Sequence, residues 1–414
     1  MKFVLQVLSL LLLTSMSAPA MSAELAGVSK PEPQALRWRT GVVRIAVSSS
    51  LTAQNSSIKA DSDVLGAVRR SLAAWESVTG LEFRLEFSDR QNVSPSGAAG
   101  DGVSLITIAA TPDNLQLFGK DPFGESARTR VFFNRRGSIT EGDVVLNPLQ
   151  QFSTDGAFGT FDLETTLTHE IGHLLGLRHS PVTGSIMAER IGRNTDQYYG
   201  PRSPGAADLA AVRELYGVES DTCCGSVSGR LSGLAKNVKN ATVWLEDADS
   251  RVVGQADVAP DGSYRVGGLP DGKFRAFWKA AGSFGELGSA TVESGSAVNL
   301  SKKVSPERTD LTLDLIGLNM QPGDSAITIR AGRQYYLCVG GSGFGSGLTS
   351  ISLSSKYLRV ENSTLAKAEF GNRFDASSVT ITVEPDAPAG VYSLYAERGD
   401  GSTAVMVGAV VVTK

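Results

Sequence analysis

The chain has 414 residues, with 43 acidic and 39 basic side chains and a formal net charge of −4 at neutral pH. The charges are mixed in sign and no basic run stands out, which argues against nucleic acid or an anionic membrane as the main partner. Three cysteines in a chain of this length do not make a disulfide scaffold. Enzymes and binding proteins remain as the classes to distinguish.

The first 23 residues have the features of a secretory signal peptide. Lys2 precedes an apolar run over residues 4–13, and the small residues at 18–20 and 21–23 offer two cleavage sites. The run is too short for a membrane span, and no later segment is long and apolar enough to be one. We therefore expect residues 1–23 to be removed, and a mature protein that is secreted, either extracellular or periplasmic.

Patterns of apolar residues predict helices and strands in the first half of the chain. An apolar stripe at helical spacing predicts a helix over residues 63–79. The alternation of Leu81, Phe83, Leu85 and Phe87 with charged residues then predicts a half-buried strand. Four further segments are predicted to be strands, and the last two of them precede the histidine-rich segment: residues 42–47, 103–108, 130–133 and 143–146.

All three histidines of the chain fall within residues 169–179. His169 and His173 are four residues apart, so on a helix they project from one face. The preceding eight residues contain neither glycine nor proline, which favours such a helix. Gly176 can take a positive φ and end the helix in a sharp turn. That turn would bring His179 back to the same metal ion.

The residue types indicate a zinc site of the catalytic kind. Three imidazoles leave a fourth position on zinc for water, whereas structural sites usually have four protein ligands. Glu170 stands between the first two ligands and is the carboxylate that a hydrolytic site needs as a base. A structural zinc site, and an inactive relative that keeps the ligands, are the alternatives.

The spacing His-Glu-x-x-His-x-x-Gly-x-x-His resembles the metzincin motif. Met187, eight residues after the third histidine, resembles the metzincin Met-turn, although a core-filling methionine is the simpler alternative. Ser180 after that histidine, the lack of a tyrosine two residues after Met187, and the Leu-Tyr-Gly ending of residues 208–217 resemble the matrixin branch. Residues 36–219 are therefore similar to a matrixin-type metallopeptidase of the secreted, bacterial type.

This resemblance implies an α+β metzincin-like domain with zinc endopeptidase activity and a protein or peptide substrate. It implies that Asp208 is buried and supports the methionine turn, with an ordinary acid in the first turn of a helix as the alternative. A substrate-binding edge strand is expected near residues 128–134. The pocket for the residue after the scissile bond is expected to be walled by residues 191–204. Two tyrosines of this segment, Tyr198 and Tyr199, either line the pocket or only pack against other residues of the protein.

Two departures from the family pattern stand out. No further histidine exists, so the second, structural zinc of vertebrate-type matrixins is not expected. No cysteine precedes Cys223, so latency through a propeptide cysteine on the zinc is not expected either. Calcium is common in the family and is a further candidate cofactor, with aspartate and glycine residues between 113 and 143 as ligands.

The composition changes after Gly217, and short alternating runs separated by turn signals predict all-β sandwiches. Residues 225–303 contain an Asp-Gly-Ser-Tyr hairpin before a Leu-Pro-x-Gly turn, and they resemble carboxypeptidase-regulatory-like sandwiches. Residues 305–414 resemble an Ig-like domain, and the IPT/TIG type is the candidate subtype. The expected fold is thus multidomain: an α+β peptidase followed by two all-β sandwich domains suited to binding a cell surface or matrix.

The cysteines offer one candidate bridge. Cys223 and Cys224 are adjacent, and adjacent cysteines rarely bond to each other because the geometry is strained. In an oxidising compartment we expect one of them to bridge to Cys338, which would leave the other free.

Two functions from different classes therefore compete. The first is a secreted zinc endopeptidase. The second is an exported adhesion or binding protein whose zinc domain is inactive or secondary. The intact Glu170 favours the first, because a decayed enzyme often loses its base.

Overall fold

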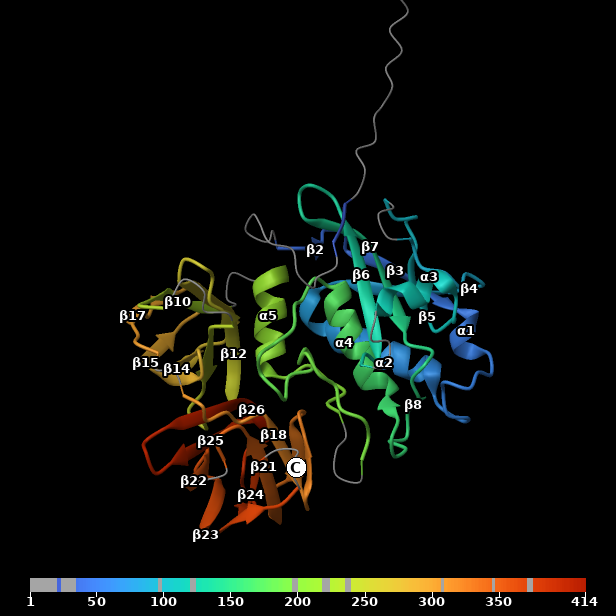
Figure 1. Ribbon diagram of the computed structural model, residues 1–414. Helices are drawn as coiled ribbons and strands as arrows, with labels where there is room; N and C mark the ends of the chain where they lie inside the picture. Colours follow the sequence, from blue (N-terminus) through green and yellow to red (C-terminus); the bar gives the residue numbers. More distant parts are fainter. Residues whose placement is uncertain are drawn as a thin grey trace, which may run out of the picture.

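The computed structural model describes residues 21–23, 35–95, 99–119, 124–195, 200–217, 224–234, 240–306, 309–344, 347–370 and 375–414. An α+β region, which ends at residue 217, is followed by a β-rich portion (Figure 1). We refer to the two parts of that portion as the middle β region, residues 224–306, and the C-terminal β region, residues 309–414. Apart from residues 21–23, the expected signal peptide lies outside the described residues.

One twisted sheet organises the α+β region, and its order is β1-β6-β7-β5-β3-β4, with β2 also paired to β7. Strands β3, β4, β5 and β7 run parallel, whereas β6 is antiparallel to β7. A small separate pair is formed by β8 (Phe152–Ser153) and β9 (Phe161–Asp162). The strands of the main sheet are β1 (Met21–Ala23), β2 (Arg37–Trp38), β3 (Val42–Ser48), β4 (Glu82–Ser88), β5 (Ser104–Thr107), β6 (Ala127–Phe133) and β7 (Ser138–Leu146).

The expected edge strand is confirmed only in part. β6 covers most of residues 128–134 and is the second strand from one end of the sheet. The short strand β1 pairs antiparallel with its last three residues, Val131–Phe133. With residues 21–23 in place, the free edge of the sheet is therefore limited to the first part of β6.

Two long helices pack on one face of this sheet. α2 (Val64–Thr79) confirms the helix predicted over residues 63–79, with Asp63 as its N-cap. Trp75 is fully buried and donates its indole N–H to the carbonyl oxygen of Thr168 on α4 (2.9 Å). The remaining helices are α1 (Ser49–Thr52), α3 (Pro112–Leu115), the 3-10 turn η1 (Gln116–Phe118), α4 (Leu163–Leu174) and α5 (Ala206–Tyr216).

The predicted strand over residues 81–87 is confirmed as β4, but one of its side chains was assigned wrongly. Leu81, Phe83 and Leu85 pack against the core, whereas Phe87 is 68% exposed. β4 forms the edge of the sheet opposite β1, so it has a neighbouring strand on one side only and its end is less covered than an inner strand. Alternation alone does not reveal where that cover stops.

The middle β region consists of two four-stranded sheets that enclose one apolar core. The first has the order β13-β10-β16, with β17 also on β10, and the second has the order β12-β11-β14-β15. The predicted hairpin turn precedes β13, where Gly262 has φ +86°. The strands are β10 (Gly225–Ser232), β11 (Thr242–Glu246), β12 (Val252–Asp257), β13 (Ser263–Leu269), β14 (Gly272–Ala280), β15 (Ser283–Val292), β16 (Ala297–Asn299) and β17 (Lys302–Lys303).

The C-terminal β region also has two sheets around a core of its own, with the orders β19-β18-β21-β24-β23 and β20-β26-β25-β22. The sandwich class of both β regions is therefore as expected, while their domain boundaries and families stay predictions. The strands are β18 (Leu315–Leu318), β19 (Gln321–Gly323), β20 (Ile327–Arg330), β21 (Gln334–Gly341), β22 (Leu348–Leu353), β23 (Leu358–Ala368), β24 (Asp375–Val383), β25 (Gly390–Arg398) and β26 (Thr403–Thr413).

The three regions pack against one another through a shared apolar cluster. α5, the last helix of the α+β region, packs against α2 on one side and against strands β12 and β13 of the middle β region on the other (Figure 1). Trp244 and Phe277 stack with their ring centroids 5.2 Å apart. The buried members of this junction cluster come from all three regions: Val182, Ala207, Trp244, Val252, Phe277, Val405 and Val407.

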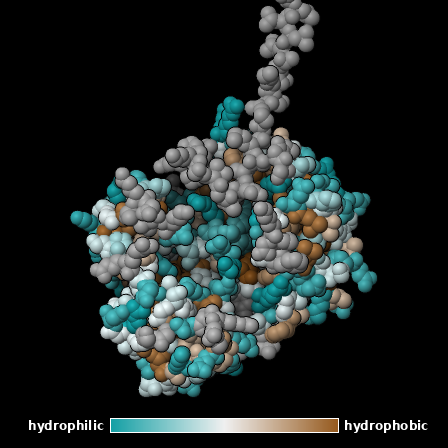
Figure 2. Space-filling view, in the orientation of Figure 1, coloured by the Kyte–Doolittle hydropathy of each residue, from teal (hydrophilic) through white to brown (hydrophobic). Residues whose placement is uncertain are grey.

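Polar and apolar residues are interspersed over the face in view in Figure 2. No helix among the described residues is both long and apolar enough to cross a membrane.

The expected bridge to Cys338 is wrong. Cys338 is a free cysteine, fully buried on β21 inside the C-terminal β region, whereas Cys224 is disulfide-bonded. Burial raises the pKa of the Cys338 thiol to about 11. Cys338 packs within the sheet of its own region, and it is not bonded to Cys224. Cys223 lies outside the described residues.

Cys338 should therefore react with an alkylating reagent only after unfolding. In the native protein its burial and its raised pKa both suppress the reactive thiolate. Peptide mapping after alkylation without reductant should find Cys338 unlabelled in buffer and labelled in denaturant. An unlabelled Cys338 in denaturant would mean that it is bridged after all.

Candidate metal centre

α4 carries the first two histidines, and its sequence explains where it begins. The side chain of Asp162 caps the helix by accepting the backbone N–H of Thr165 (2.9 Å). Four apolar residues that recur at helical spacing along α4 are fully buried in the core of the α+β region: Leu163, Leu167, Ile171 and Leu174. This burial fixes the rotation of the helix and therefore the direction in which the histidines project.

The C-terminal end of α4 is held by two aromatic side chains. Trp38 donates its indole N–H to the carbonyl oxygen of Leu174 (2.9 Å), and the Tyr216 hydroxyl donates to that of Leu175 (2.8 Å). Gly176 follows with φ +97°, and a side chain there would collide with the carbonyl oxygen of Leu36 at 2.1 Å. The predicted helix-ending role of Gly176 is thus confirmed.

The turn brings the third histidine to the first two. The ligand nitrogens of His169, His173 and His179 all lie within 4.8 Å of one another. The Nε2 atoms of His169 and His173 are 3.1 Å apart. Tetrahedral zinc with bonds of about 2.0–2.1 Å would separate two ligand nitrogens by about 3.3 Å. The spacing of these two nitrogens therefore fits a shared ion, and the His179 nitrogen lies close enough to join them.

Backbone carbonyls orient two of the rings. The Nδ1 atom of His169 lies 2.7 Å from the carbonyl oxygen of Ile186, and that of His173 lies 2.9 Å from the carbonyl oxygen of Leu177. A proton on Nδ1 that bonds to a carbonyl leaves the Nε2 lone pair free for a metal. Both Nε2 atoms are thus available on the side where the rings converge.

Burial keeps these imidazoles neutral. Burial, with a smaller contribution from the neighbouring His179, lowers the pKa of His169 to about 4. Burial also places the pKa of His173 well below its usual range and lowers that of His179, which is the most exposed of the three. A neutral imidazole is the form that binds a metal, so the site is prepared for one at neutral pH.

Glu170, between the two helical ligands, is buried and has one strong polar partner. The hydroxyl of Thr129 on β6 lies 2.5 Å from its Oε2 atom. Burial raises the pKa of the Glu170 carboxyl to about 7, although the hydrogen bond from Thr129 opposes that rise. A carboxyl with a pKa near neutrality can both accept and return a proton.

Met187 lies directly against α4. It is 2% exposed, and a methyl group on Gly172 would meet its sulfur atom at 2.2 Å. The loop around it, residues 180–188, is closed by a hydrogen bond from the backbone N–H of Ser180 to the Met187 carbonyl oxygen (2.7 Å). We call this segment the Met187 loop, and it packs against α4 at Gly172, between His169 and His173 in the chain.

Asp208 holds this loop from α5. Its buried carboxylate accepts the backbone N–H of Ile186 (3.1 Å), the N–H of Gly205 (2.8 Å) and the Ser185 hydroxyl. Burial raises the pKa of Asp208, and these hydrogen bonds oppose the rise. Since Ile186 also supplies the carbonyl that orients His169, Asp208 contacts the residue that supports a candidate ligand.

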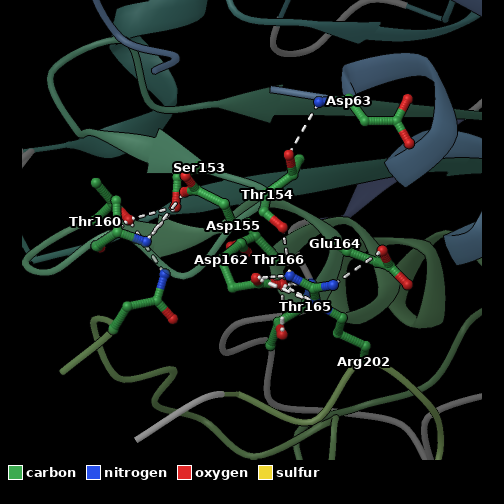
Figure 3. Close-up of polar contacts among 12 residues, drawn as sticks. Asp63, Ser153, Thr154, Asp155, Thr160, Asp162, Glu164, Thr165, Thr166 and Arg202 are labelled. Carbon is green, nitrogen blue, oxygen red and sulfur yellow. Dashed lines mark hydrogen bonds and ion pairs between the residues drawn. The ribbon is translucent and has the colours of Figure 1, made fainter. Parts of the chain in front are cut away.

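Residues 191–204, the segment predicted to wall the pocket, are anchored to the start of α4 through Arg202. Figure 3 shows the Arg202 side chain reaching the carboxylate of Asp162, with a nitrogen–oxygen distance of 2.6 Å. Arg202 also donates to the carbonyl oxygen of Thr154 (2.8 Å). Residues 196–199, which include Tyr198 and Tyr199, lie outside the described residues, so their predicted lining role stays a prediction.

Among the described residues, one group of at least three metal-binding side chains lies close enough together to share an ion, and it consists of the three histidines. In the segment expected to bind calcium, Asp143 and Glu141 are both buried on β7. Asp143 accepts two backbone N–H groups, and burial raises its pKa to about 7. Calcium stays a prediction.

Sequence reasoning missed several residues of this site. Nothing in the pattern marked Thr129 as the partner of Glu170, because the contact joins β6 to α4 across 41 positions. Trp38 and Arg202 were missed for the same reason. Thr129 lies between Arg128 and Arg130 on β6, so its polarity did not distinguish it from its neighbours.

Comparisons with known proteins agree with this arrangement. Residues 113–217 match the family model described as Matrixin. The chain is 24% identical over 193 residues to Metalloendoproteinase 1 of Glycine max, which covers 44% of this chain and 53% of that protein. It is 27% identical over 169 residues to the Hatching enzyme of Paracentrotus lividus, and that match covers 38% of this chain and 23% of that protein. The chain thus spans about half the length of the first relative and a quarter of the second.

Solved structures add little. The major pilin subunit BcpA of Bacillus cereus is 14% identical, covers 46% of this chain and 69% of that chain, and has a TM-score of 0.19. The glucan-utilisation protein SGBP-B of Bacteroides ovatus is 13% identical, covers 45% and 43%, and has a TM-score of 0.20. Scores this low carry no argument. The family match, the two relatives and the histidine cluster support a matrixin-type metallopeptidase domain.

The substitution Asp208→Asn should weaken the Met187 loop without changing its size. One carboxylate oxygen becomes an N–H donor that faces other donors, so we expect the free energy of unfolding to fall by about 1–3 kcal/mol. Denaturant unfolding of the metal-free protein measures this loss. Asp89→Asn, at an exposed aspartate of the same region, is the matched control. Equal stability of the two variants would contradict the role given to Asp208.

Proposed function

We propose that this chain is an exported zinc endopeptidase that hydrolyses peptide bonds within proteins or peptides. One observation carries the proposal: three neutral imidazoles converge on one point, and a buried glutamate stands between two of them in the chain. Structural zinc sites usually have four protein ligands. Three ligands leave a position for water, which favours catalysis.

The donor set fits zinc in number, chemistry and spacing. His169, His173 and His179 would hold the ion through nitrogen atoms, which zinc accepts readily in tetrahedral sites. When bound, zinc acidifies water toward a pKa of roughly 7 and polarises a carbonyl group. The protein's own part is to keep the three rings neutral and oriented, through burial and the carbonyls of Ile186 and Leu177.

Glu170 is the proposed general base and acid. Its carboxyl accepts a proton from the attacking water and returns it to the leaving amine, a role for which a pKa of about 7 is well matched. The hydroxyl of Thr129 fixes one carboxyl oxygen. The other oxygen is then the one that handles the proton.

The substrate is proposed to bind as an extended strand along β6. A strand added to a sheet edge gains backbone hydrogen bonds whatever its sequence, which suits a peptidase. The part of β6 around Thr129 lies next to Glu170, so a strand paired there passes the base. Export from the cell, a calcium requirement, and binding to a surface or matrix through the β regions are further parts of this proposal.

The substitution Glu170→Ala should abolish cleavage while zinc stays bound. General acid–base catalysis contributes on the order of 10²- to 10⁴-fold, so we expect at least that loss in kcat. Cleavage of an unfolded protein and of a quenched-peptide library, with zinc content measured in parallel, gives the result. A zinc chelator should stop the wild-type reaction.

Glu86→Ala is the matched control, because Glu86 is an exposed carboxylate of the same region. Full activity in Glu170→Ala would remove the proposed role of Glu170. Absence of cleavage by the zinc-loaded wild-type protein would instead favour the exported binding protein with an inactive zinc domain.

The substitution Thr129→Val should separate positioning from metal binding. Valine keeps the shape of threonine but removes the donor to Glu170, and a hydrogen bond to a charged group contributes about 1.5–3 kcal/mol. We expect kcat to fall about 10- to 100-fold with zinc content unchanged. Thr129→Ser keeps the hydroxyl and should recover most of kcat. If the valine and serine variants have the same kcat, the hydrogen bond does not position Glu170.

A further inference from the structure

The outer side of the Met187 loop is covered by the β-rich portion of the chain. Val182, at the start of this loop, is fully buried and belongs to the junction cluster with Val405 and Val407 of β26. On its inner side the same loop carries Ile186 and Met187 against α4. The loop is therefore packed between the candidate metal centre and the C-terminal β region.

Backbone contacts join the two regions at this point. The N–H of Thr183 donates to the carbonyl oxygen of Val407 (2.9 Å). Gly184 approaches β26 so closely that an added methyl group would meet the Gly408 carbonyl oxygen at 2.8 Å and a Val411 methyl group at 2.9 Å. Gly408 in turn leaves no room for a side chain beside Val182. Such contacts leave little freedom for the loop to shift.

The space behind the contact is almost filled. A small cavity of about 10 Å³ remains between the two regions. Thr165 of α4 and Ile186 line it on one side, and Thr328 of β20 and Val411 of β26 line it on the other. Thr165 lies one helical turn before His169 on α4. The C-terminal β region thus reaches the residues that stand directly behind a candidate ligand.

We propose that β26 is a positioning element of the metal centre. By fixing residues 183 and 184, it fixes Ile186, whose carbonyl oxygen orients His169. The inference rests on the proposed function in one respect, because it takes the three histidines as the zinc ligands. It gives the C-terminal β region a role in zinc binding, and this role is separate from any role of that region in binding a substrate or a surface.

The test is a substitution that forces the Met187 loop and the C-terminal β region apart. Gly184→Ala inserts a methyl group against Gly408 and Val411 without touching a ligand, and should push the loop from β26. Changes in the partners that orient ligands cost about 10- to 100-fold in metal affinity, so we expect a loss of about tenfold or more. Zinc affinity is measured by equilibrium competition with a chromophoric chelator, together with the unfolding midpoint of the metal-free protein.

Three further variants make the result specific. Gly323→Ala, in the same β region, adds a methyl group where nothing lies within 4 Å and should bind zinc like the wild type. Val411→Ala added to Gly184→Ala removes one of the colliding groups and should recover part of the affinity. Val182→Ala loosens the contact without a clash and should lower zinc affinity by a smaller factor, which keeps the test available if Gly184→Ala does not fold.

Wild-type zinc affinity in both Gly184→Ala and Val182→Ala would overturn the inference, even if both variants unfold more easily, because the contact would then be structural alone. The readout is independent of cleavage. A wild-type protein that binds zinc but cleaves no substrate would defeat the proposed function and leave this test intact.

Discussion

The α+β region is organised around one requirement, which is to hold three imidazoles neutral, close together and correctly turned. Burial lowers the pKa of each ring, and backbone carbonyls fix the orientation of two of them. A helix positions only the first two histidines. The third depends on a turn that Gly176 permits and on a loop that returns beneath the helix. The rest of the structure can be understood as support for that turn and that loop.

This support comes from segments that lie far apart in the chain. Trp38 and Tyr216 hold the carbonyls at the end of α4, and Asp208 holds the Met187 loop. α5, which carries Asp208, packs on the middle β region, and the Met187 loop packs on β26. The two β regions are consequently joined to the candidate centre through protein contacts, and they do not extend from it as a separate tail. A buried apolar cluster shared by three regions makes independent motion of any one of them costly.

Local patterns in the sequence predicted most of the elements around the centre. Helical spacing of apolar residues predicted α2, the lack of glycine and proline before His169 favoured α4, and the histidine spacing predicted the cluster itself. Contacts between distant segments were not predictable, because periodicity carries no information about which surfaces meet. Thr129, Trp38 and the contact of Gly184 with β26 belong to this class. The wrong cysteine bridge has the same origin, since burial of Cys338 within its own sheet depends on the tertiary fold.

X-ray absorption at the zinc edge, on the metal-loaded full chain, tests the central claim most directly. Three histidine ligands and an open position predict one zinc ion per chain, three nitrogen neighbours from imidazole at about 2.0–2.1 Å, and one oxygen neighbour from water. A shell made of four protein ligands, or a chain that retains no zinc, would contradict the account.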